Sequence, residues 1–103
     1  MLFLDDLLID EVNEAKMAAH EVGVMEALEV LDVARYELFQ NPARRRGGAP
    51  YVIVGPTRAG RLLTMPIDDT PVDGLWRPRT AYDSGKQQAV AYHGRRRGKR
   101  GTL

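Results

Sequence analysis

Residues 51–67, YVIVGPTRAGRLLTMPI, place two runs of aliphatic and β-branched side chains on either side of the short segment PTRAG. Two such runs joined by a glycine-containing turn are typical of a β-hairpin, because glycine readily adopts the positive φ that tight turns require. A hairpin with an apolar face needs other elements to cover that face. We therefore expect a small sheet built around residues 51–67.

A chain of 103 residues is long enough for one hydrophobic core. Its composition, 44% hydrophobic and 28% charged, is that of an ordinary globular protein. The last ten residues, GRRRGKRGTL, contain five basic residues and no acidic one, and such a like-charged block repels itself. We expect one domain over residues 1–93 and a disordered basic tail over residues 94–103.

A helix is predicted over residues 11–20. Asp10 lies where a capping side chain belongs, since it directly precedes the helical pattern. Val12, Ala15 and Ala19 recur at a spacing of three and four residues, so they share one face of the helix. We expect this face to pack on the sheet.

A second helix is predicted over residues 24–35, after the helix-breaking Gly23. Acidic residues occupy its opposite face. The residues expected to face the core are Val24, Ala27, Leu28, Leu31 and Ala34.

Further strands are expected in residues 6–9, 36–42 and 75–83, and a short helix in residues 84–94. Residues 36–42 could instead extend the second helix, but Pro42 limits such an extension. The predicted fold class is α+β: a small antiparallel sheet with two N-terminal helices on one face and a short C-terminal helix.

The sequence contains no cysteine, which excludes disulfides, thiolate metal sites and a cysteine nucleophile. The opening segment MLFLDDLLID is too short and too acidic for a signal sequence or membrane span. His20 and His93 lack the spacing of a metal site, and no phosphate-binding glycine loop is present. We expect a cytoplasmic location, no metal, no cofactor and no membrane partner.

Charge is distributed very unevenly along the chain. Residues 1–40 carry two basic and ten acidic residues, a net charge of −8, whereas residues 41–103 carry thirteen basic and four acidic residues, a net charge of +9. This asymmetry is compatible with internal complementarity, with head-to-tail association of copies, or with a basic surface for a polyanion such as nucleic acid.

Arg58 and Arg61 flank the predicted hairpin turn, where a guanidinium fork can bind phosphate. They can equally be solvated surface residues. The segment ARRRGGAP, residues 43–50, is expected to form an exposed, mobile loop. The other candidate nucleic-acid-binding residues in this basic half are Arg44, Arg45, Arg46, Lys86, Arg95, Arg96 and Arg97.

Arg79, Tyr82 and Asp83 lie where the predicted strand over residues 75–83 ends. Tyr82 or Asp83 can transfer a proton, and an arginine can stabilise a charged phosphorane, as cleavage of RNA by its own 2′-hydroxyl requires. The structural alternative is a Tyr–Asp hydrogen bond, or a helix cap at Asp83 or Ser84.

Two further residues allow a functional and a structural interpretation. His20 ends the first predicted helix, where the helix dipole favours its protonated form, so it is either a proton donor or a cap for backbone carbonyls. Trp76 either stacks on a base or anchors the small core.

Three stretches, AKMAAHEVGVMEALEVLD, PYVIVGPTRAGRLLTMPI and GLWRPRTAYDS, carry a resemblance. Over residues 6–93 the chain resembles the BrnT-like toxins of the RelE ribonuclease superfamily, in particular the uncharacterised BrnT-like proteins of actinobacteria and their phages. Arg58, Gly60 and Arg61 match the family's glycine–arginine hairpin turn. Tyr82 stands where the family's strand-end motif has arginine, and ARRRGGAP lacks the acidic residue expected before the hairpin.

The resemblance implies an RNA-directed toxin, a metal-independent endoribonuclease neutralised by a cognate antitoxin. The predicted catalytic residues are Arg61, Arg79, Tyr82 and Asp83. The alternative is a non-catalytic accessory protein, from a phage or prophage, that binds nucleic acid or protein. A homo-oligomer held by acidic and basic faces is a further expectation.

Overall fold

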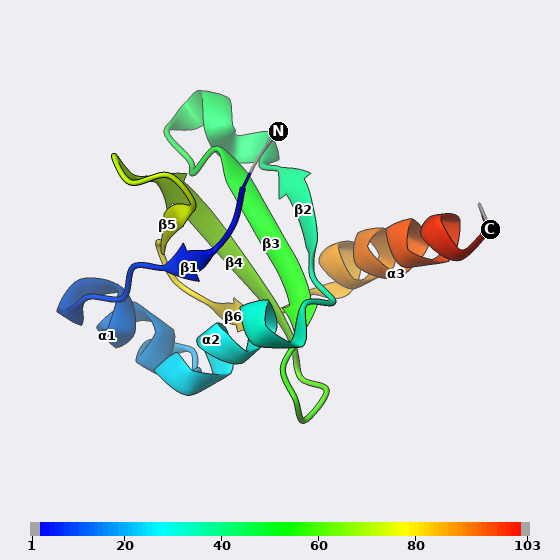
Figure 1. The fold of residues 1–103 in the computed structure, drawn as a ribbon, viewed down its shortest axis with the longest axis horizontal. Helices are drawn as coiled ribbons and strands as arrows, with labels where there is room; N and C mark the ends of the chain where they lie inside the picture. The colour runs from blue at the N-terminus through cyan, green and yellow to red at the C-terminus, as the bar shows by residue number, and fades with distance from the viewer. Residues whose placement is uncertain (1–2, 102–103) are drawn as a thin grey trace.

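The computed structural model describes the backbone of residues 3–101 and the side chains of residues 3–98. The chain forms an α+β domain, which confirms the predicted fold class (Figure 1). The elements in chain order are β1 (Asp6–Leu7), α1 (Glu11–Ala19), α2 (Val24–Val33), β2 (Glu37–Gln40), the 3₁₀ helix η1 (Pro42–Arg46), β3 (Tyr51–Pro56), β4 (Leu62–Asp69), β5 (Leu75–Pro78), β6 (Tyr82–Asp83) and α3 (Lys86–Gly101).

The sheet has the order β1-β5-β4-β3-β2, and β6 pairs with β4 beyond the end of β5. The predicted hairpin is confirmed: β3 and β4 pair from Tyr51 opposite Ile67 to Pro56 opposite Leu62. Gly60 adopts a φ of 89° in the turn. All pairs are antiparallel except β1 with β5, which is parallel, so the sheet is mixed.

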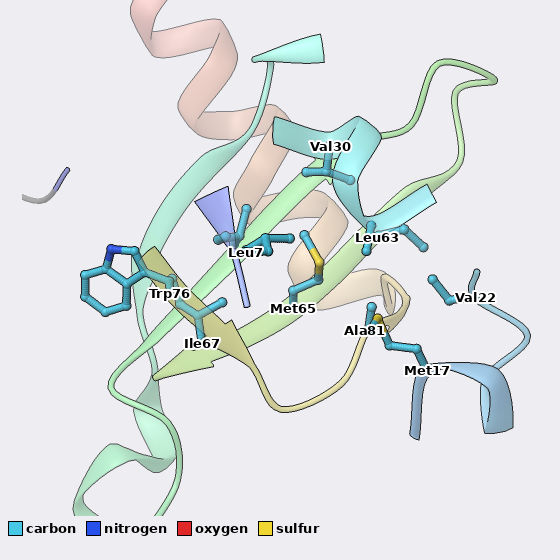
Figure 2. Packing of buried hydrophobic residues seen from close by; sticks show 11 residues of the cluster. Leu7, Met17, Val22, Val30, Leu63, Met65, Ile67, Trp76 and Ala81 are labelled. Atoms are coloured by element: carbon cyan, nitrogen blue, oxygen red, sulfur yellow. The ribbon is translucent and has the colours of Figure 1, made fainter. Parts of the chain in front are cut away.

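The two faces of the sheet have different environments, because successive side chains of a strand alternate between them. Ile53, Leu63, Met65 and Ile67 belong to the main core together with residues of α1 and α2. Figure 2 shows Leu63, Met65 and Ile67 in this cluster. We call the opposite face of these strands the outer face. It carries Val52 and Val54 of β3 and Thr64 and Pro66 of β4.

Trp76 belongs to the core cluster and is 9% exposed (Figure 2). Its indole Nε1 donates a hydrogen bond to the carbonyl of Phe3 at 2.9 Å, and its ring meets Tyr51 edge-on. A buried indole with a satisfied N–H supplies a large apolar area. Trp76 is therefore a core anchor.

Helix α1 begins after Asp10 as predicted, but the predicted buried face is wrong. Asn13 and Met17 are buried, whereas Val12 is 57% exposed. The Asn13 amide donates to the carbonyls of Leu8 and Pro78, both at 2.9 Å, and accepts from the backbone of the capping Asp10. These bonds set the rotation of the helix, so residues 13 and 17 face the core.

Helix α2 buries Ala27 and Val30, and Leu28 and Leu31 pack partly against the core. Ala34 is exposed in the left-handed conformation that ends the helix, so its predicted place on the buried face is wrong. The following segment forms strand β2, as expected.

Two predicted segments have a different structure. The segment expected as a mobile loop includes η1, which is capped by Asn41, although its three arginines are exposed as predicted. The predicted strand 75–83 is divided into β5 and β6. Pro78 lies opposite Ile67 and Tyr82 opposite Thr64, so the three residues 79–81 face the two residues 65 and 66 of β4. One extra residue in one of two paired strands is characteristic of a β-bulge.

The predicted disordered tail is wrong for residues 94–101, because α3 continues through them. Side-chain contacts hold α3 against the rest of the domain. Tyr92, 6% exposed, donates a hydrogen bond to the carbonyl of Arg35 at 2.6 Å, and Arg96 lies 3.1 Å from the buried carboxylate of Glu37. Residues 102–103 lie outside the described residues. Figure 1 shows α3 pointing away from the body of the domain.

Candidate nucleic-acid interface

The hairpin arginine Arg58 is directed to helix α2. Its guanidinium forms a salt bridge with Asp32, and its backbone N–H donates to Glu29 at 3.2 Å. The positive charge of this predicted nucleic-acid-binding residue is therefore balanced within the protein.

Arg61 is held by four groups from three segments. Its guanidinium contacts Asp83 of β6 at 2.6 Å and Glu26 of α2 at 3.0 Å, and donates to the carbonyls of His20 and Glu21. The hydrogen bond from Arg61 lowers the pKa of the Asp83 carboxyl. The pKa of Glu26 is lowered first by the backbone N–H of Gly23 and then by Arg61. These carboxylates also raise the pKa of Arg61.

Tyr82 and Asp83 are consecutive residues of β6, so their side chains leave on opposite faces. The Tyr82 ring lies 5.7 Å from the His20 ring, centroid to centroid, and burial raises the pKa of the Tyr82 phenol. Asp83 instead pairs with Arg61. At the start of α3, the side-chain Oε1 of Gln88 accepts a hydrogen bond from the backbone N–H of Gly85. The structure thus gathers His20, Arg61, Tyr82 and Asp83 at one corner.

Arg79 lies away from this corner. Its guanidinium binds both carboxylate oxygens of Asp68, at 2.7 and 3.0 Å, and donates to the carbonyl of Gly47 at the end of η1. Asp68 lies six positions further along β4 than Leu62, the neighbour of Arg61. This corresponds to about 20 Å at about 3.3 Å per residue. The predicted catalytic arginines Arg61 and Arg79 therefore do not converge, and each is paired with a carboxylate.

The remaining predicted basic residues lie on η1 and α3. Arg96 pairs with Glu37, and Arg44 donates to the carbonyl of Asn41. Among residues 3–98, the basic residues on these two helices that are exposed and form no salt bridge are Arg44, Arg45, Arg46, Lys86, Arg95 and Arg97. We call these six residues the basic rim.

A groove of about 420 Å³ lies on the outer face, between η1 and the first turns of α3. Val52, Val54, Thr64 and Pro66 line the sheet side of the groove. The other lining residues are Phe39, Gln40, Asn41, Pro42, Ala43, Tyr82, Gln87, Gln88 and Ala91.

Two aromatic residues lie on opposite sides of the groove, since Phe39 is on the edge strand β2 and Tyr82 is on β6. The Arg95 guanidinium lies over the Phe39 ring, 3.9 Å from its centroid, and donates to the carbonyl of Leu38. Phe39 is not among the site residues predicted from the sequence. In a strand, Phe39 and Leu38 point to opposite faces of the sheet, which is the pattern that could have indicated its place. The sequence does not show which face is left uncovered, because this depends on how the helices pack.

The fold and the site define an α+β domain with a groove flanked by exposed basic residues. The sequence matches no family model, and no curated protein is significantly similar to it. The resemblance to BrnT-like toxins stays a prediction from short motifs. Within the described part of the chain, no cluster of three histidine or acidic residues could hold a metal ion. None of its helices is long and apolar enough to cross a membrane.

Proposed function

We propose that this protein binds RNA through the basic rim and does not itself cleave it. The observation that carries the proposal is the distribution of charge. The arginines of the hairpin and of β5 form salt bridges with the protein's own carboxylates, whereas six basic residues on η1 and α3, the two helices that border the groove, are exposed and form no salt bridge. Guanidinium and ammonium groups that form no salt bridge are suited to phosphate.

This proposal predicts strongly salt-dependent affinity. Each phosphate neutralised on a single strand releases about 0.7 counterion. Contact of four to six rim residues with phosphates gives a slope of about −3 to −4 for log affinity against log salt. Fluorescence anisotropy with a labelled single-stranded RNA, titrated at several salt concentrations, measures this slope.

A triple variant tests the location of the site. Replacing Arg44, Arg45 and Arg46 by serine should weaken RNA binding about tenfold or more at low salt, because three phosphate-binding charges are lost. The matched control removes the same charge elsewhere, by replacing Lys16, Arg35 and Arg58 with serine, and should change affinity far less. Absence of binding by the unmodified protein, or an equal loss in both variants, would contradict the proposal.

A second candidate function is cleavage of the bound RNA, as the resemblance implies. The observation that favours it is the proximity of the His20 and Tyr82 rings beside Arg61. The imidazole could accept the proton of the attacking 2′-hydroxyl. The phenol is protonated at neutral pH, and burial raises its pKa further, so it could donate to the leaving 5′-oxygen. Tyr82 also lines the groove, so the same strand of RNA would reach it.

Incubating labelled RNA with the purified protein and a chelator tests this candidate. Fragments ending in a 2′,3′-cyclic phosphate, absent with His20→Ala and Tyr82→Phe, would establish cleavage and overturn the non-catalytic proposal. RNA that stays intact at saturating protein concentration would exclude the cleavage activity.

The antitoxin and the homo-oligomer stay predictions. A partner that binds the acidic residues 1–40 could also contact apolar side chains there, because Val12 is 57% exposed and Met25 is 69% exposed. Sedimentation velocity at low and high salt measures self-association, which salt should weaken if opposite charges hold the copies together.

A further inference from the structure

We infer that the groove on the outer face accepts an unpaired nucleobase, so that the nucleic acid bound by the basic rim is single-stranded. This inference rests on the proposed function and names its substrate class. It depends on the groove between η1 and α3, whereas binding to the rim alone depends only on charge.

The floor of the groove is apolar enough to receive the face of a base. Val52 and Pro66 are partly exposed and lie on neighbouring strands in direct register. Val54 and Thr64, two residues further along, are each 1% exposed, so Val52 and Pro66 form the accessible part of the floor. The volume of about 420 Å³ falls in the range of small-molecule sites. The bases of a duplex are stacked and paired in its interior, so only an unpaired base can enter such a groove.

Aromatic side chains stand on both sides of this floor. The Tyr82 ring is half-buried by its neighbours, and Phe39 is half-buried under Arg95. Aromatic rings and guanidinium planes are the groups on which proteins stack single-stranded bases. Phe39 and Tyr82 therefore offer stacking surfaces at opposite walls of one groove, and Arg95 lies over the Phe39 ring.

Side-chain amides supply polar contacts for the edge of a base. Asn41 and Gln88 each accept one backbone hydrogen bond through their amide oxygen, which orients the side chains. Among the described residues, their amide nitrogens donate to no protein acceptor, so these N–H groups can reach the carbonyl or ring-nitrogen acceptors of a base.

Phosphate-binding groups lie where the backbone of such a strand would enter and leave. Arg44, Arg45 and Arg46 extend from η1 at one end of the groove, and Lys86 begins α3 at the other. A single strand that lies across the outer face can thus place phosphates at both ends while one base fills the groove. Charge complementarity and the stacking groups together favour this occupant.

The test compares affinities for four labelled probes of equal length: single-stranded RNA, single-stranded DNA, duplex RNA and an abasic strand. We expect the two base-containing single strands to bind about tenfold tighter than the abasic strand. Tyr82→Leu and Phe39→Leu should remove most of this advantage, with a much smaller effect on abasic binding. Phe3→Leu, at an aromatic residue 62% exposed and outside the groove, is the matched control.

Tyr82→Phe retains the ring and should keep the preference, which separates stacking from loss of the hydroxyl. Circular dichroism checks that each variant is folded. If all four probes bind equally tightly, the base site is overturned while the proposed function stands. If no probe binds, both are overturned. Tighter binding of single-stranded RNA than of single-stranded DNA would indicate that the protein also contacts the 2′-hydroxyl of the sugar.

Discussion

Arg61 holds Asp83 with two nitrogens, Nε at 2.6 Å from Oδ1 and Nη2 at 3.2 Å from Oδ2. The same guanidinium reaches Glu26, so it joins the hairpin turn, β6 and α2. Planar, bidentate pairing of this kind is specific to arginine. The hairpin arginine is thus a connection between elements, and its carboxylate partners occupy the donors that a phosphate would need.

Arg61→Lys should lower the melting temperature, because lysine keeps the charge but cannot make the forked contact. Asp83→Asn should do the same. The double variant should lose less than the sum of the two, since both changes remove one interaction. Thermal unfolding followed by circular dichroism measures this. Arg45→Lys, at an exposed arginine, is the control and should leave the melting temperature unchanged.

Acid should destabilise the fold through the paired carboxylates. The pKa values of Asp10, Glu26 and Asp83 are lowered in the folded state, Asp10 and Asp83 chiefly by arginine hydrogen bonds and Glu26 chiefly by a backbone N–H. Their contribution is therefore complete above the ordinary values of 3.8 and 4.5 and is lost as pH falls through the lower folded values. Urea unfolding at a series of pH values measures this. Arg61→Gln should make the decline shallower, and equal slopes would contradict the assignment.

Asn13→Ala should cost about 2–4 kcal/mol of the free energy of unfolding, because it removes a capping interaction and the two hydrogen bonds donated by the amide of a fully buried side chain. The carbonyls of Leu8 and Pro78 lose their amide donor. Urea denaturation measures the change. Lys16→Ala on the exposed side of the same helix should stay within about 0.5 kcal/mol. A small effect of Asn13→Ala would mean that water or a rotated helix replaces these bonds.

Gly55→Ala should destabilise the protein by about 1–3 kcal/mol through overpacking. A Cβ at Gly55 would lie 2.7 Å from the Cβ of Tyr36 and 2.9 Å from Cγ1 of Val30. Gly98→Ala is the matched substitution. It meets nothing within 4 Å in helix α3 and should stabilise the helix by about 0.5–1 kcal/mol. Opposite signs in equilibrium unfolding are the expected result.

Tyr92→Ala should undock α3 from the sheet, because it removes a buried ring and the hydrogen bond to the Arg35 carbonyl. Trypsin should then cleave at Arg95–Arg97 about tenfold faster or more, as local opening becomes easier. Val90→Ala, at a residue 61% exposed on the same helix, should cleave at the original rate. Unchanged cleavage of Tyr92→Ala would place the docking contact elsewhere.

Local patterns predicted the elements whose signals lie within a few residues. The β3–β4 hairpin follows from two apolar runs around a glycine turn, and α1 begins after the capping Asp10 as expected. The buried face of α1 could not be predicted, because Asn13 reads as polar. It becomes buried only since Leu8 and Pro78 supply carbonyls for its amide.

The candidate site shows the same limit. The basic character of residues 41–103 was evident, and Arg44, Arg45 and Arg46 are exposed as predicted. The sequence did not show which arginines form salt bridges within the protein. Arg61 and Arg79 lie 22 and 11 residues from the aspartates that pair with them. The groove could not be predicted because η1, the sheet and α3, which line it, come together only in the folded chain.

The sequence alone determined the α+β class, the central hairpin and the separation of an acidic half from a basic half, because hydrophobic spacing, turn residues and charge are properties of the chain itself. The tertiary structure decided which arginines are neutralised and where a groove remains open. The reason is that both depend on distances between segments far apart in sequence, and those distances are set by the packing of α1, α2 and α3 on a sheet whose two faces are covered unequally.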